Sequence, residues 1–179
     1  KSHDSKKFLF TIEFFPEEGK YHYDGHRLCK FSSPPEETKR LHKLCPSCGK
    51  PVTVGVMYRV AELADRPFGG KPKITIPYKS MVPLDEIIGE SLGLGVASKK
   101  VKEAYQSLIK KIGNEFMVLT ETSQSELALA TTPDVVEGIM RVREGRIRIV
   151  PGYDGQYGKV EIFKDGERAA KPSRQKELF

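Results

Sequence analysis

The chain has 179 residues, which is enough for one large domain or two small ones. No hydrophobic run approaches the length that spans a membrane and no signal peptide is visible, so we expect no membrane partner. The three cysteines, an odd number, fit a reducing compartment, so we expect an intracellular, cytoplasmic protein. The formal net charge of +6 and the pI near 9.1 favour a polyanionic partner, although so small an excess can also serve solubility alone.

The first third of the chain contains one clear strand pattern and one clear helix pattern. Residues 8–15 form an aromatic and β-branched run that Pro16 ends, which predicts a strand. Residues 16–53 show little regular pattern. Thr53 is then suited to cap a helix over 54–64. The expected apolar face of this helix consists of Val56, Met57, Val60, Ala61 and Ala64.

All three cysteines lie in the stretch without regular pattern and have the spacing of a structural zinc site. His26 and Cys29 form one pair with two residues between them, and Cys45 and Cys48 form another. Four protein ligands complete a tetrahedral zinc site and leave no place for an activated water, so we expect a scaffold and no catalysis at this metal. The alternatives are His22 as the fourth ligand, a thioredoxin-like redox pair, or three unrelated free thiols.

The second half of the chain is predicted to be mainly helical. Apolar residues repeat at helical spacing between a Ser98 cap and Gly113, and Ser123 opens a capping box before 127–130. Further helices are expected at 84–92 and from Pro133 to Gly145. Residues 146–150 and 159–163 alternate in polarity on either side of a glycine-rich turn, which predicts a β-hairpin.

These elements predict an α+β fold in two domains. We place a zinc-binding domain at 1–66, where a helix directly after a Cys-Pro-x-Cys-Gly turn is typical of a treble-clef-like finger. A linker rich in Pro and Gly follows at 67–80, and a helical domain that ends in the β-hairpin takes 81–163. Residues 164–179 form a polar tail.

Basic residues gather in three places. Arg27 lies among the zinc loops beside Tyr21 and Tyr23, and Lys99 and Lys100 begin the strongest helix pattern. A third group runs from a helix end into a strand and comprises Arg141, Arg143, Arg146 and Arg148. Cations on ordered backbone suit a phosphate surface, and tyrosines can stack on bases. The alternatives are a solvated helix face for the lysines and an exposed hairpin face without a partner for the last two arginines.

Four stretches, at 11–27, 45–66, 76–90 and 137–145, resemble the C-terminal half of endonuclease Q, a DNA-repair enzyme of archaea and some bacteria. They include Tyr-His-Tyr-Asp-Gly-His-Arg at 21–27, and the likeness covers nearly the whole chain up to Phe163. The resemblance implies an intact protein that nicks DNA on the 5′ side of deaminated bases (uracil, hypoxanthine, xanthine) and of abasic sites. DNA would be its partner and the nucleoid its place in the cell.

The same resemblance implies that cleavage uses metal ions held in an N-terminal PHP domain by clustered His, Asp and Glu residues. Apart from the histidines of the zinc finger, this chain has only His3 and His42, and neither is accompanied by the carboxylates that a two-metal site needs. We therefore expect the catalytic metal ions only in a domain that this chain does not contain. The chain alone is predicted not to cleave DNA.

By resemblance, the finger and the helical domain would hold the duplex around a lesion and support an extruded base. The candidates near the lesion are Tyr21, His22, Asp24, Arg27, Tyr78 and Lys79. Asp24 could equally shape the zinc loop as an Asx-turn residue, and Tyr78 could be a packing residue.

The last five residues resemble the start of the peptide by which archaeal proteins bind the sliding clamp PCNA. Gln175, Leu178 and Phe179 match the pattern Gln-x-x-Leu-Phe, and the alternative is a disordered tail. Two other functions remain open for the chain as a whole. One is a stand-alone zinc-finger adaptor whose helical domain binds protein, and the other is an RNA-binding module.

Overall fold

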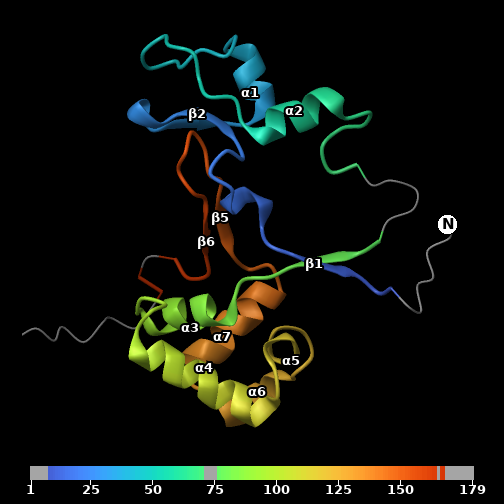
Figure 1. The fold of residues 1–179 in the computed structure, drawn as a ribbon, viewed down its shortest axis with the longest axis vertical. Coiled ribbons are helices and arrows are strands. Elements are labelled where there is room, and N and C mark those ends of the chain that lie inside the picture. The colour runs from blue at the N-terminus through green and yellow to red at the C-terminus, as the bar shows by residue number, and fades with distance from the viewer. Residues whose placement is uncertain (1–7, 71–75, 165, 168–179) are drawn as a thin grey trace, which may run out of the picture. The chain divides into compact units, whose positions relative to one another are not determined.

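The computed structural model describes residues 8–70, 76–164, 166 and 167, which belong to two compact units. Of these residues, the first unit contains 8–70, 76–80 and 149–160, and the second contains 81–148, 161–164, 166 and 167. Both helices and short strands are present (Figure 1), which confirms the predicted mixed class. None of the described helices is long and apolar enough to cross a membrane.

The first unit consists of short elements. β1 (Thr11–Glu13) pairs in parallel with β4 (Tyr78–Ser80), and β2 (Asp24–His26) pairs antiparallel with β3 (Phe31–Ser33). The helices are η1 (Pro16–Glu18), η2 (Arg27–Cys29), α1 (Pro35–Arg40) and α2 (Val56–Leu63). The strand predicted over 8–15 is shorter than expected. Helix α1 lies where we expected little regular structure, and its acidic first turn and basic last turn suit the helix dipole.

Helix α2 begins after Gly55, and the prediction that Thr53 caps it is wrong. Thr53 instead exchanges backbone hydrogen bonds with Gly25 of β2, at 2.8 and 2.9 Å. The apolar face of this helix is largely open, because Val56 is 61% and Val60 46% exposed. Helical spacing shows which residues share a face but not whether the chain covers that face.

The second unit is a helical bundle with one apolar core. Helix α3 (Leu84–Leu92) packs against α4 (Lys99–Ile112) and α7 (Pro133–Arg143), and α5 (Glu115–Thr120) and α6 (Gln124–Ala130) lie between them in the chain. The fully buried core side chains include Leu84, Ile87, Ile88, Val101, Leu108, Val118, Leu127 and Ile139. The predicted caps are confirmed: Ser98 accepts the N–H of Val101, and Ser123 and Glu126 form a capping box. Helix α5 was not predicted.

The two strands β5 (Arg148–Val150) and β6 (Lys159–Glu161) pair, which confirms the predicted β-hairpin with shorter strands. The connection at 151–158 belongs to the first unit, whereas the predicted boundary placed it in the helical domain. The cause is a set of backbone hydrogen bonds to 17–20. The N–H groups of Gly152, Gly155 and Gly158 donate to the carbonyl oxygens of Glu17, Lys20 and Glu18 at 2.8, 2.9 and 3.0 Å.

Candidate functional site

The structure brings the predicted zinc ligands together in the first unit. Within the described residues, His26, Cys29, Cys45 and Cys48 form a group in which each offers one ligand atom, and all four atoms lie within 4.8 Å of one another. Nδ1 of His26 lies 3.3 Å from Sγ of Cys48 and is thus the ring nitrogen near this thiol. His22 is buried outside the group, so of the two histidines it is His26 that completes the donor set.

Two turns of similar geometry carry these four residues. The residue directly after each second ligand has a left-handed backbone, with φ 51° at Lys30 and φ 70° at Gly49. In each turn the chain closes on itself, because the N–H of Lys30 donates to the carbonyl of Arg27 (3.0 Å) and that of Gly49 to the carbonyl of Cys45 (2.8 Å). Successive N–H groups in such a turn form a concave nest that favours thiolate ligands.

The pKa values of two of these thiols, Cys29 and Cys45, depart from the ordinary value in opposite directions. Burial raises the pKa of Cys45, but hydrogen bonds from the backbone N–H of Ser47 and from His26 outweigh it and lower that pKa to about 6. The hydrogen bond with Cys48, together with burial, raises the pKa of Cys29 to about 11. Three thiol sulfurs and one imidazole nitrogen are a donor set typical of structural zinc, so these residues fit a zinc ion. A treble-clef arrangement stays a prediction.

Asp154 joins the first zinc turn to the segment that follows the second, and the sequence analysis missed it. Its Oδ2 accepts a hydrogen bond from the backbone N–H of Arg27, and its Oδ1 accepts one from the hydroxyl of Thr53, both at 2.6 Å. Arg27 follows the first ligand, and Thr53 follows the second turn. Burial raises the pKa of Asp154, but the bonds from Thr53 and Arg27 outweigh this and keep it below its usual value. The pair Asp-Gly in the sequence indicates a turn at this position, but nothing in the sequence indicates that Asp154 bonds to Arg27 and Thr53.

The motif at 21–27 is divided between surface and interior. Tyr21 is 47% exposed and Arg27 is exposed, whereas His22 and Asp24 are buried. Oδ1 of Asp24 accepts the N–H of Gly55 at 2.6 Å, at the start of α2, so this carboxylate orders the helix start. Among the described atoms its Oδ2 has no hydrogen-bond partner. DNA contact by His22 or Asp24 stays a prediction that their burial does not favour.

The other residues of this unit that we predicted to contact DNA, Tyr78 and Lys79, lie on β4. Tyr78 is largely exposed, and Nζ of Lys79 lies 4.4 Å from the centroid of the Phe10 ring. Both side chains lie on a short strand at the surface, where they are available to a partner. The packing role considered for Tyr78 is not what its exposure indicates.

The basic residues of the second unit differ in their surroundings. Lys99 and Lys100 are exposed in the first turn of α4, and Lys99 is only loosely paired with Glu103, at 3.7 Å. Arg143 is engaged inside the unit, where it donates to the carbonyls of Val118, Leu119 and Thr122.

The remaining arginines pair with carboxylates. Arg141 bonds to Glu137 and Glu167, and its guanidinium lies 4.7 Å from the Phe163 ring centroid. Arg146 pairs with Glu137 and Glu144, and Arg148 pairs with Glu161 at 3.2 Å. The DNA-binding role of these arginines stays a prediction. Arg141 and Arg143 make contacts within the unit that explain their presence without DNA. Gln175, Leu178 and Phe179 lie outside the described residues.

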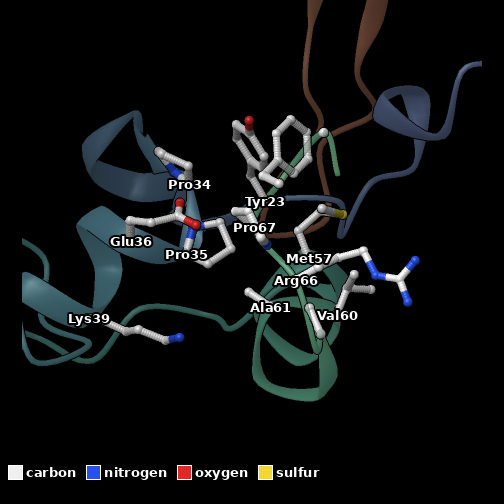
Figure 2. A pocket seen from close by; sticks show the side chains of 13 residues that line it. Tyr23, Pro34, Pro35, Glu36, Lys39, Met57, Val60, Ala61, Arg66 and Pro67 are labelled. Atoms are coloured by element: carbon white, nitrogen blue, oxygen red, sulfur yellow. The ribbon is translucent and has the colours of Figure 1, made fainter. Parts of the chain in front are cut away.

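A groove of about 590 Å³ lies between α1 and α2 in the first unit. Figure 2 shows Pro34 and Pro35 on one side and Met57, Val60 and Ala61 on the other, and Arg66 and Pro67 also line it. The walls are mainly apolar and include the open face of α2. Such a surface suits an apolar partner better than a phosphate backbone.

Comparisons with known proteins identify relatives over most of the chain. Residues 83–146 match the family model of the MJ0043 C-terminal domain. The chain is 38% identical over 159 residues to the uncharacterized protein MJ0043 of Methanocaldococcus jannaschii, covering 87% of this chain and 20% of that protein. It is 28% identical over 165 residues to the uncharacterized protein YqxK of Bacillus subtilis, covering 90% of this chain and 38% of that protein.

Two solved structures are similar to the chain at 33% identity. One is the lesion-specific endonuclease PfuEndoQ from Pyrococcus furiosus, with a TM-score of 0.72 over 84% of this chain and 37% of that one. The other is endonuclease Q in complex with a 27-mer duplex substrate with an abasic lesion at the active site, with a TM-score of 0.69 over 86% of this chain and 38% of that one. The chain is thus similar to part of endonuclease Q and spans less than half of the length of these two chains.

Proposed function

We propose that the chain is the zinc-stabilised, DNA-recognising part of a repair endonuclease of the endonuclease Q type. The observation that carries this proposal is the similarity to endonuclease Q at 33% identity over 84% of the chain. The whole protein would nick DNA on the 5′ side of deaminated bases (uracil, hypoxanthine and xanthine) and of abasic sites. It would act inside the cell, at the nucleoid.

The zinc ion would be structural in this proposal. His26, Cys29, Cys45 and Cys48 would hold it, and the ion would pin the two turns in place of the larger apolar core that so small a unit lacks. The test is elemental analysis and chelation. We expect one zinc per chain, and chelator should unfold the first unit while α3–α7 retain their helical circular dichroism. A folded first unit after complete metal removal would contradict this role.

The DNA contacts would come from exposed residues of both units. Arg27, Tyr78 and Lys79 lie at the surface of the first unit, and Lys99 and Lys100 lie at that of the second. Phosphate contacts of this kind position a duplex, and extrusion of a base costs a few kcal/mol that they must offset. Binding should therefore depend steeply on salt, with log K falling by about 0.9 per contacted phosphate for each unit of log salt.

Fluorescence anisotropy with a labelled duplex tests these contacts. The double variant Lys99→Ala, Lys100→Ala should lower the salt slope by about 2. Arg59→Ala is the control, because it removes an exposed cation that is already paired with Glu62 at 3.0 Å. No duplex binding at low salt, or equal effects of the test and control variants, would contradict the proposal.

Two parts of the proposal concern the whole protein. Catalytic metal ions would belong to a PHP domain outside this chain, so the chain alone would bind DNA without nicking it, and metal-dependent nicking by the chain would refute this. Recruitment by PCNA would use Gln175, Leu178 and Phe179. A Phe179→Ala variant should lose clamp binding in calorimetry without changing the affinity for DNA.

The groove beside α2 favours a second function, that of a protein-binding adaptor. An adaptor would show no salt-dependent affinity for nucleic acid. The anisotropy experiment therefore separates the two functions.

A further inference from the structure

Two segments that are far apart in the sequence, 20–27 and 155–157, present a group of aromatic and cationic side chains in the first unit. The OH of Tyr21 and Nη1 of Arg27 both lie 3.6 Å from the point where a Cβ on Gly155 would stand. Nζ of Lys20 lies 5.3 Å from the ring centroid of Tyr157, a ring that is 75% exposed. We name these four residues, Lys20, Tyr21, Arg27 and Tyr157, the tyrosine–cation surface.

The backbone beneath this surface is ordered. Asp154 and Gly155 have φ 45° and 83°, and the N–H groups of Tyr153 and Gln156 each donate to the other residue's carbonyl, which is the geometry of a two-residue hairpin turn. The N–H of Gly155 donates to the carbonyl of Lys20 at 2.9 Å, so the turn is joined to the loop that carries Tyr21. The side chains are therefore displayed from a preformed base.

Within the described residues, neither cation of this surface, Lys20 or Arg27, is held in a direct ion pair, although Arg27 interacts electrostatically with the Asp154 carboxylate. Both differ in this from the three arginines of the second unit that pair with carboxylates. Asp154 is the acidic neighbour of Arg27, and its two oxygens are already engaged by the N–H of Arg27 and the hydroxyl of Thr53.

We infer that the tyrosine–cation surface binds an unpaired stretch of DNA, an inference that rests on the proposed DNA-recognition function. Exposed aromatic rings next to cations bind single strands, because bases stack on the rings while the cations follow the phosphates. A fully paired duplex hides its base faces and can use only the cations. This surface therefore confers a preference for DNA whose bases have left the stack.

The test compares a duplex with the same duplex containing internal unpaired thymines, by anisotropy with the full chain. Tyr157→Ala should weaken binding of the unpaired substrate about tenfold and leave duplex binding unchanged. Tyr21→Ala should weaken binding of the unpaired substrate to a similar extent. Tyr157→Phe keeps a stacking ring and should retain the affinity. Phe68→Ala is the matched control, since it removes an aromatic ring that is 90% exposed but lies in the groove beside α2.

The outcomes separate this inference from the proposed function. Duplex binding without any effect of the tyrosine variants would overturn the inference and leave the proposed function in place. Binding of unpaired DNA without duplex binding would support the inference and contradict duplex recognition. Tighter binding of the RNA strand of the same sequence would overturn the assignment to DNA. Circular dichroism of each variant should match that of the unchanged chain, and Tyr157→Phe keeps the test valid if an alanine variant unfolds.

Discussion

The cross-link made by Asp154 should be a major determinant of the stability of the zinc-binding unit. We choose Asp154→Gly as the perturbation, because Asp154 has a φ of 45° that glycine tolerates without strain. The substitution removes two hydrogen bonds of 2.6 Å, to the N–H of Arg27 and to the hydroxyl of Thr53. Hydrogen bonds to a charged group contribute about 1.5–3 kcal/mol each when buried.

The carboxylate of Asp154 is only half-buried, so solvent screens both bonds and about 1 kcal/mol each is the better figure. The expected loss for Asp154→Gly is about 2 kcal/mol, which lowers Tm by about 4–8 °C for a chain of this size. Asp154→Asn keeps one acceptor oxygen and tolerates the same turn, so about half of this loss is expected.

Thermal unfolding followed by circular dichroism in zinc-saturated buffer measures these values, and the absence of tryptophan makes this the natural probe. Thr53→Val supplies the matched partner variant. It should cost about 1 kcal/mol in the unchanged chain and close to nothing together with Asp154→Gly, because its acceptor is then gone. The reasoning is refuted if Asp154→Gly stays within about 0.5 kcal/mol of the unchanged chain, or if Thr53→Val costs the same in both backgrounds.

Three further substitutions test the fold. A Cβ on Gly158 would lie 2.1 Å from the carbonyl oxygen of Glu17, so Gly158→Ala should lower the free energy of unfolding in urea by more than about 2 kcal/mol, whereas Gly95→Ala, in open space, should change it little. Arg143→Met leaves the carbonyls at the end of α5 without their donor and should cost about 3 kcal/mol, with faster amide exchange in α5; unchanged exchange would contradict this role. The pKa of Glu137 is lowered by hydrogen bonds from Arg141 and Arg146, so this stabilisation exists above the unfolded pKa of about 4.3 and is lost as pH falls through the lower folded value. Glu137→Gln should therefore reduce the loss of unfolding free energy at acidic pH, and an unchanged pH dependence would contradict the pairing of Glu137 with Arg141 and Arg146.

Local chemistry was readable from the sequence where one short segment determines the structure. The caps at Ser98 and Ser123 and the pairing of His26 with Cys29 each depend on residues within a few positions of one another. Helix α1 was not predicted, because six residues from Pro35 to Arg40 are too few to show a helical period.

What the sequence could not show are contacts between distant segments. Asp24 orders the start of α2 across 31 positions, and Asp154 reaches Arg27 across 127. The Arg143 side chain was assigned to a DNA surface from its charge alone, yet it contacts the carbonyls at the end of α5. Charge and spacing give the type of an interaction, whereas the partner depends on the tertiary fold.

Because residues 149–160 complete the zinc-binding unit, the sequence of that unit encloses helices α3–α7. During translation, the first eighty residues cannot complete their unit until residues 149–160 have been synthesised. Neither unit can be exchanged by a single crossover in evolution. A truncation anywhere between 81 and 148 would leave the metal-binding unit without residues 149–160.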